Sequence, residues 1–185
     1  MALEPETSPA LFAKAVIRAA LDDQALPEPP DEEFYRQRAA CFVSIKKQGE
    51  LRGCIGTLEP AEKELGPEII RNAQSAAFGD PRFPAVNAVE FEHLNFSVDV
   101  LSVPEVVCSP GELDCRRYGV IVSCDYRRGV LLPDLEGVDN VDDQLVIACR
   151  KAAIEASEDF SIHRFTVSRY NEDWRPGDAP PGAAC

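Results

Sequence analysis

The chain has 185 residues, of which 45% are hydrophobic and 28% are charged, and a formal net charge of −13 at pH 7. Its length is enough for one well-formed core, and its composition is ordinary for a soluble globular protein, which excludes gross disorder. The acidity argues against nucleic-acid binding, because that binding depends on Lys and Arg side chains that neutralise phosphates.

The sequence shows no pattern typical of a secreted protein, a membrane protein or a metal-binding protein. The first seven residues lack the cationic and apolar regions of a signal peptide, and no run approaches the roughly 18 apolar residues of a membrane span. We therefore expect a cytoplasmic protein with no membrane contact. The seven cysteines include no Cys-x-x-Cys pair, and the two histidines, His93 and His163, are far apart in the sequence. We expect no metal site, and the sequence identifies no cofactor.

The first predicted elements are a helix and a connector. Ser8 is a suitable N-cap with Pro9 at the first helical position, and the helix continues with one apolar face to about Leu21. Residues 26–33 hold three prolines and four carboxylates, which predicts a solvated connector on the surface.

A β-hairpin is predicted next. Residues 42–47 are rich in β-branched and aromatic side chains, and residues 50–57 have a strand-like pattern. Gln48-Gly49 between them is a plausible tight turn, with glycine where a positive φ is needed. The two segments should pair as antiparallel strands, and finding either one in a helix would contradict this.

The register of the hairpin decides which side chains share a face. If Lys47 pairs with Glu50, the alternation of a strand puts Arg52 and Cys54 on one face, with Cys54 opposite Val43. Residues two apart on a strand are separated by about 7 Å, close enough for a guanidinium to favour a thiolate.

Two interpretations of this segment remain open. In the first, Gly53 and Gly56 let a ligand approach Cys54, which acts as a thiolate beside Arg52. In the second, the glycines allow close packing, Cys54 is a small core residue and Arg52 pairs with a carboxylate. Free cysteine is commonly buried, so general physical chemistry alone favours the second.

A helix and a rigid loop follow the hairpin. Apolar residues recur at helical spacing from Gly66-Pro67 until Gly79 ends the helix. Asp80, Arg82 and Phe83 then lie in a loop held by two prolines, which suits ligand contact. The alternative is a turn cap, a surface ion pair and an aromatic plug of the core.

The remaining elements give the fold class. We predict a strand over 96–101, a second hairpin over 118–124 and 129–133, a long helix from near Asn140 and a final strand over 162–170. Hairpins and helices without regular alternation indicate an α+β protein with mainly antiparallel sheet and flanking helices. Residues 171–185 are expected to form a disordered tail, because they offer little to bury.

The segment Leu51-Arg-Gly-Cys-Ile-Gly-Thr57 resembles the signature of the AMMECR-one domain family, whose bacterial and archaeal members are called protein A of the AmmeMemoRadiSam system. The resemblance covers about Ala10 to Tyr170. It departs from the family at Asp134, where members typically carry glutamine. Further similar segments follow in the same order: Ala76–Pro84, Phe96–Ser102, Tyr118–Val122, Val130–Pro133 and Cys149–Ala152.

The resemblance implies one domain over residues 1–170, with a main lobe and a smaller lobe around a cleft. It also implies a functional link to a Memo-type protein and a radical-SAM enzyme. Two functions compete: an enzyme or small-anion-binding protein, and a non-catalytic protein-interaction module. Whether the protein is an enzyme, and its oligomeric state, stay open. The first function would use Cys54, Arg52 and Asp80 as catalytic residues and Gly53, Gly56, Arg82 and Phe83 as ligand-binding residues.

Overall fold

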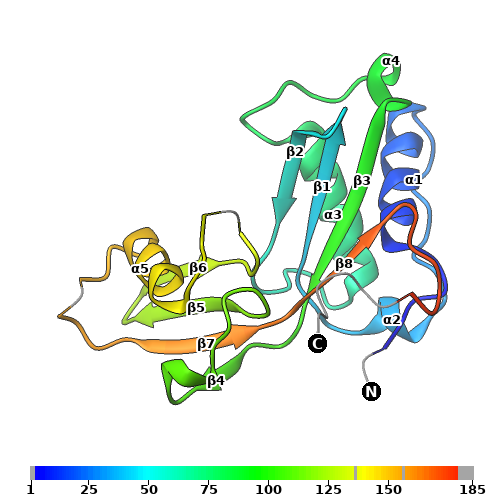
Figure 1. The fold of residues 1–185 in the computed structure, drawn as a ribbon. Helices are drawn as coiled ribbons and strands as arrows, with labels where there is room; N and C mark the ends of the chain where they lie inside the picture. The colour runs from blue at the N-terminus through cyan, green and yellow to red at the C-terminus, as the bar shows by residue number, and fades with distance from the viewer. Residues whose placement is uncertain (1–2, 136, 156, 179–185) are drawn as a thin grey trace. The chain divides into compact units, whose positions relative to one another are not determined.

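The computed structural model describes residues 3–135, 137–155 and 157–178 (Figure 1). The chain divides into two compact units. Unit 1 runs to Leu101 and resumes at Arg169, and the smaller unit 2 holds Ser102–Ser168. Five α-helices and two four-stranded antiparallel sheets lie within the described residues, which confirms the predicted α+β class.

Unit 1 is built on one sheet with strand order β2-β1-β3-β8. Helix α3 packs against β1 and β2, and α1 packs against β3 and α3 (Figure 1). The strands are β1 (Cys41–Lys47), β2 (Glu50–Gly56), β3 (Leu94–Leu101) and β8 (Val167–Asn171), and the helices are α1 (Pro9–Leu21), α2 (Glu33–Arg36), α3 (Leu65–Phe78) and α4 (Ala88–Phe91).

The two faces of this sheet differ because its strands alternate. On β1, Val43 and Ile45 are fully buried in the core that α1 and α3 cover. On β3, Phe96 and Val98 enter the same core. The intervening side chains on both strands are mostly polar and at least partly exposed, so the opposite face of the sheet carries hydroxyl, amide and charged groups.

The predicted first helix and first hairpin are confirmed. Ser8 caps α1 by accepting the backbone N–H of Leu11, with Pro9 at the first helical position. Gln48 and Gly49 both have positive φ, 53° and 86°, as expected for a two-residue hairpin turn that matches the twist of its strands.

The predicted register of the hairpin is wrong beyond its first pairs. Lys47 pairs with Glu50 as expected, but the register shifts after Lys46, and Cys54 lies opposite Ser44 instead of Val43. The cause is a β-bulge that adds Arg52 to β2 without a partner on β1. Cys54 therefore points to the polar face, while Gly53 faces α3.

Unit 2 has its own sheet, with strand order β4-β7-β5-β6, and its own apolar core. Helix α5 packs against β5 and β6. The predicted second hairpin and long helix are confirmed, and Asn140 caps the helix by accepting the N–H of Asp143 at 2.8 Å. The elements are β4 (Glu105–Val107), the 3-10 helix η1 (Pro110–Glu112), β5 (Gly119–Cys124), β6 (Arg127–Leu131), α5 (Val141–Lys151) and β7 (Ser161–Phe165).

The C-terminal part of the chain differs from expectation in two ways. The single strand predicted over 162–170 is two strands, β7 and β8, that belong to different sheets. Unit 1 also continues beyond the boundary expected at residue 170, since Glu172 pairs with Lys14 at 2.8 Å and Trp174 is only 6% exposed in the core. Residues 179–185 of the expected tail lie outside the described residues.

Candidate functional site

The Cys54 thiol is half-buried on β2, at the edge of the sheet of unit 1. The Ser44 hydroxyl on the neighbouring strand donates a hydrogen bond to Cys54 Sγ across 3.2 Å. This contact fixes the side chain of Cys54 beside Ser44 on the polar face of the sheet. The bulge at Arg52 creates this contact, because it brings Ser44 opposite the cysteine.

The loop after α3 binds the backbone of Cys54 from the open edge of β2. The Cys54 N–H donates to Asp80 Oδ2 at 2.9 Å, and Arg82 Nη2 donates to the Cys54 carbonyl at 3.0 Å. These two side chains take the place of a neighbouring strand at one residue and satisfy groups that an edge strand leaves unpaired. They fix the peptide that carries the thiol.

Asp80 and Arg82 are also paired with each other. Arg82 donates from Nε to Oδ1 at 3.0 Å and from Nη2 to Oδ2 at 2.7 Å. The guanidinium holds the pKa of the Asp80 carboxyl well below its ordinary value, and the backbone N–H groups of Cys54 and Arg82 act in the same direction. Asp80 is therefore an ionised, buried anchor and no proton donor at neutral pH.

Arg52 has a different partner. Its guanidinium makes a bidentate pair with Glu90, with Nη2 to Oε1 at 2.7 Å and Nε to Oε2 at 3.1 Å. Lys47 also reaches Glu90, at 3.1 Å, and Asn87 forms a capping box with it at the start of α4. Arg52, followed by Lys47, lowers the pKa of Glu90 to about 2.

The structure brings most of the sequence-predicted residues into one neighbourhood. Cys54, Asp80 and Arg82 are joined by direct hydrogen bonds. Arg52 and Arg82 both approach the Phe83 ring, with their guanidinium carbons 6.0 and 5.5 Å from its centroid. Arg52 pairs with Glu90 and Arg82 pairs with Asp80, and these ion pairs hold this segment of β2 in place.

Gly53 and Gly56 make close packing contacts. A Cβ at Gly53 would lie 2.3 Å from the carbonyl oxygen of Ala76 on α3, and one at Gly56 would lie 2.4 Å from the Phe42 ring. Real Cβ atoms do not approach that closely, so protein atoms already fill the space beside both glycines. This arrangement matches the packing interpretation of the two residues.

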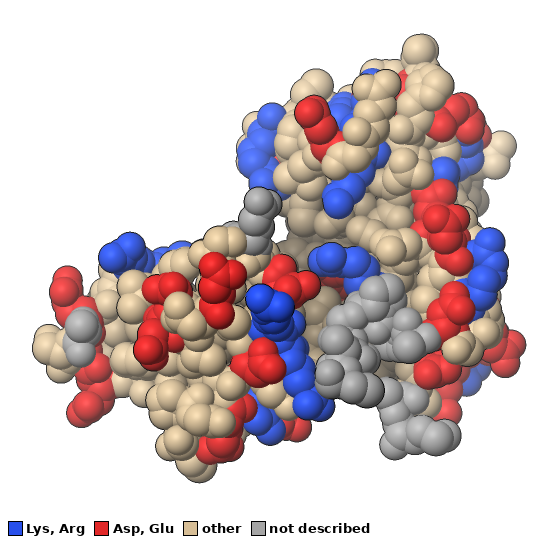
Figure 2. Space-filling model, viewed as in Figure 1, with Lys and Arg blue, Asp and Glu red and all other residues tan. Residues whose placement is uncertain are grey.

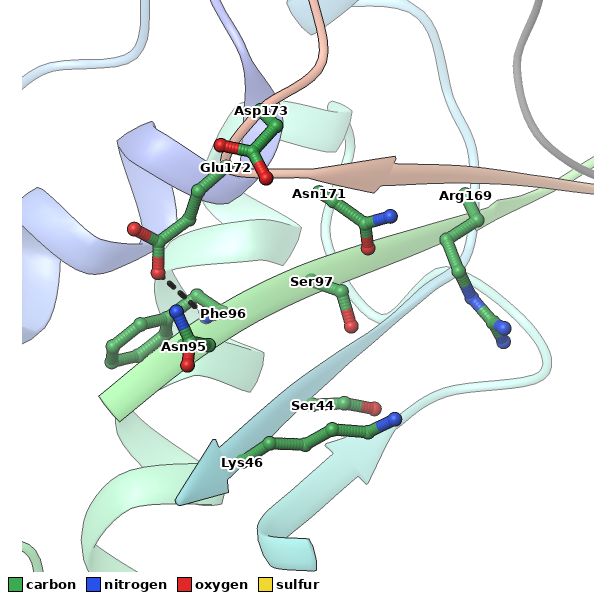
Figure 3. Close-up of a pocket in the computed structure, with 9 residues that line it drawn as sticks. All are labelled: Ser44, Lys46, Asn95, Phe96, Ser97, Arg169, Asn171, Glu172 and Asp173. Carbon is green, nitrogen blue, oxygen red and sulfur yellow. Dashed lines mark hydrogen bonds between the residues drawn. The ribbon is translucent and has the colours of Figure 1, made fainter. Parts of the chain in front are cut away.

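A polar groove of about 350 Å³ lies on the open face of the same sheet, and it was missed by the sequence interpretation (Figure 3). Ser44, the hydrogen-bond partner of the thiol, is one of its walls. The alternation of polar residues on β1 and β3 is a signal for such a face. The third wall was divided, because Arg169 lies in the predicted final strand while Asn171, Glu172 and Asp173 fall in the expected tail. The lining residues are Ser44, Lys46, Asn95, Phe96, Ser97, Arg169, Asn171, Glu172 and Asp173.

The described residues contain neither a metal-binding cluster nor a helix that could cross a membrane. Across residues 3–135, 137–155 and 157–178, no group of three or more His, Cys, Asp or Glu side chains is arranged to hold a metal ion. In the same part of the chain, none of the helices has the length and apolar character needed to cross a bilayer.

Comparison with known proteins gives consistent matches. A model of the family described as AMMECR1 matches residues 10–173. A Thermotoga maritima protein is 50% identical over 150 residues, covering 80% of this chain and 84% of that protein. Protein CA_C1420 of Clostridium acetobutylicum is 47% identical over 152 residues, and the match spans 80% of this chain but only 32% of that longer protein.

A solved structure shares the fold. The crystal structure of the uncharacterized protein PH0010 from Pyrococcus horikoshii is similar with a TM-score of 0.76 and 26% sequence identity, covering 92% of each chain. These relatives carry no description of an activity, so any function must be argued from the site.

Proposed function

We propose that this chain, which belongs to the AMMECR1 family, binds a small ligand beside the Cys54 thiol and uses that thiol as a nucleophile. The observation that carries the proposal is the hydrogen bond from Ser44 to Cys54 Sγ, because Ser44 also lines the polar groove. The thiol is thus half-buried and hydrogen-bonded to Ser44, which lines a groove of ligand size, while Cys54 is not itself one of the lining residues.

The other residues have supporting roles in this proposal. Asp80 and Arg82 are positioning residues that hold the N–H and C=O of Cys54 from the strand edge. Arg52 is a positioning residue as well, because its pair with Glu90 ties the bulge of β2 to α4. The Phe83 ring is near both arginines, with its centroid 6.0 Å from the guanidinium carbon of Arg52 and 5.5 Å from that of Arg82.

Partners follow from the family resemblance alone. We propose that the chain acts with a Memo-type protein and a radical-SAM enzyme, in a step whose chemistry the residues do not define. The competing function is a non-catalytic interaction module that docks through the hairpin, where Leu51 is 44% exposed. Thiol reactivity separates the two, since docking requires no reactive cysteine.

The proposal is tested by alkylation of the folded protein with iodoacetamide, with the labelling rate of each cysteine read by mass spectrometry. Cys54 should label far faster than Cys41, which is fully buried and has its pKa raised to about 12 by burial. Exposed Cys108 is the internal standard for an accessible thiol. Ser44→Ala should slow Cys54 labelling about fivefold, the effect of losing the one hydrogen bond that holds the sulfur in place.

Ser97→Ala is the matched control, because Ser97 lies directly across from Ser44 on β3 but makes no hydrogen bond to the thiol. Its Cys54 labelling rate should equal that of the wild type. If Cys54 labels as slowly as Cys41, and Cys54→Ser lowers the melting temperature, then the thiol is a packing residue and the nucleophile proposal fails.

Nucleic acids are expected to be poor ligands of this protein. The net charge is −13, and on the face shown in Figure 2 Asp and Glu side chains are interspersed with Lys and Arg. At about 150 mM salt, fluorescence anisotropy with single-stranded DNA and RNA should show no binding in the micromolar range. Micromolar affinity that weakens with added salt would contradict this expectation.

A further inference from the structure

We infer that the polar groove of unit 1 binds a small zwitterion, whose carboxylate pairs with Lys46 and whose ammonium group pairs with Asp173. Free amino acids and short peptides share this chemistry. The inference rests on the proposed function, because the zwitterion would be the ligand that binds near Cys54. The charges of the groove, by contrast, are independent of whether the thiol reacts.

The groove is lined by side chains with unused hydrogen-bonding groups. Among the described residues, five of its side chains make no hydrogen bond or ion pair, although each is at least partly exposed in the groove. Such a concentration of unpaired polar groups on one concave surface favours a polar ligand. These five side chains are Lys46, Asn95, Ser97, Asn171 and Asp173.

The other two charged residues of the groove, Arg169 and Glu172, already form ion pairs with residues of the protein. Arg169 makes a bidentate pair with Asp99, with both N–O distances 2.7 Å. Glu172 accepts from Lys14 Nζ at 2.8 Å and from the Phe96 N–H at 2.8 Å, the contact drawn as a dashed line in Figure 3. Among the described residues that line the groove, one cation, Lys46, and one anion, Asp173, make no ion pair and are left for a ligand.

The two uncompensated charges lie on different sides of the groove. In Figure 3 the ammonium end of Lys46 lies beside Ser44, while Asp173 extends from the opposite wall, with Ser97 and Asn171 between them. A simple anion would leave Asp173 unpaired, and a simple cation would leave Lys46 unpaired. A ligand with one charge of each sign satisfies both, and the hydroxyl and amide groups serve its remaining polar atoms.

The size and the lining of the groove limit the ligand further. Its volume of about 350 Å³ is near the lower end for ligand sites, which suits a molecule of amino-acid or dipeptide size. Phe96, the aromatic residue among the described walls of the groove, is 2% exposed and offers no ring face for stacking. Nucleobases are therefore poor candidates, because their recognition depends on stacking.

The test is isothermal titration calorimetry of the whole chain against α-amino acids, 4-aminobutyrate and dipeptides, which differ in the separation of their charges. Each zwitterion is compared with its N-acetyl form, which lacks the ammonium charge, and its carboxamide, which lacks the carboxylate. At least one zwitterion should bind roughly tenfold more tightly than either blocked form, the effect of one charge-assisted contact. Tighter binding of amino acids or of dipeptides shows which of these two classes the groove binds.

Charge-removing variants assign the contacts. Lys46→Ala should abolish the preference over the carboxamide, and Asp173→Asn should abolish the preference over the N-acetyl form. Lys63→Ala and Glu50→Gln are matched controls at exposed positions outside the groove, and they should bind as the wild type does. Equal binding of blocked and unblocked forms, absence of binding across the panel, or equal losses in the control variants would overturn the inference.

The outcome is separable from that of the proposed function. Cys54→Ser should keep the zwitterion preference, because the thiol supplies none of the charges of the groove. Slow alkylation of Cys54 with intact zwitterion binding would reject the nucleophile and keep the ligand class. Fast alkylation without zwitterion binding would keep the nucleophile and reject the ligand class.

Discussion

Replacing Glu90 with glutamine should lower the free energy of unfolding of unit 1 by about 3 kcal/mol, one of the largest effects expected for a single substitution. Glu90 and Arg52 are only 10% and 12% exposed in their side chains, and the pair is bidentate. The neutral amide removes the compensating charge, so the guanidinium stays in a poorly solvated site without a counter-ion. The effect is measured by urea unfolding followed through Trp174, the single tryptophan, which lies in the core of unit 1.

Glu92→Gln is the matched control two residues away. Glu92 pairs with Arg18, but its side chain is 70% exposed, so the loss should stay below about 1 kcal/mol. A Glu90→Gln variant as stable as the Glu92→Gln variant would show that the Arg52–Glu90 pair contributes little.

The same pair predicts a pH dependence. Arg52 lowers the pKa of Glu90 from 4.5 to about 2, so the ionised carboxylate stabilises the folded state. This contribution is fully present above pH 4.5 and is lost as the pH falls to about 2, because the carboxylate becomes protonated in the folded state as well. Between these values the stability of the wild type should fall more steeply than that of Glu90→Gln. Parallel profiles would contradict the assigned cause.

The sequence was sufficient where local chemistry decides the structure. Gln48-Gly49 predicts the hairpin because both turn positions need a positive φ, and Ser8-Pro9 predicts the start of α1. The α+β class follows from the same local patterns. The two segments that most resemble the family, around Cys54 and Asp80, are the ones that the structure joins by a hydrogen bond.

The sequence was insufficient where a distant contact decides. The bulge at Arg52 changes the face of Cys54, and Glu90, which holds Arg52, is 38 residues away in the chain. The groove combines walls from β1, β3 and β8, which no local pattern connects. Trp174 indicates that the chain beyond residue 170 still belongs to unit 1. A lone tryptophan among polar residues often anchors a segment to a core.

Replacing Gly53 with alanine should destabilise unit 1 by about 3 kcal/mol, at the upper end of the range for overpacking. The added Cβ would lie 2.3 Å from the carbonyl oxygen of Ala76, and that atom belongs to the backbone of α3. A flexible side chain could move aside, but here α3 and β2 must separate, which opens the core between them. Urea unfolding followed through Trp174 measures the loss.

Gly49→Ala in the turn of the same hairpin isolates the cause. Gly49 has a φ of 86° but nothing lies within 4 Å of its Cβ position, so alanine there should cost only about 1 to 2 kcal/mol through backbone strain. A larger loss at Gly53 than at Gly49 would show that contact with α3 requires the signature glycine. Equal losses would instead mean that α3 leaves room beside Gly53. That result would support the alternative interpretation, in which the glycine leaves space for a ligand to approach Cys54.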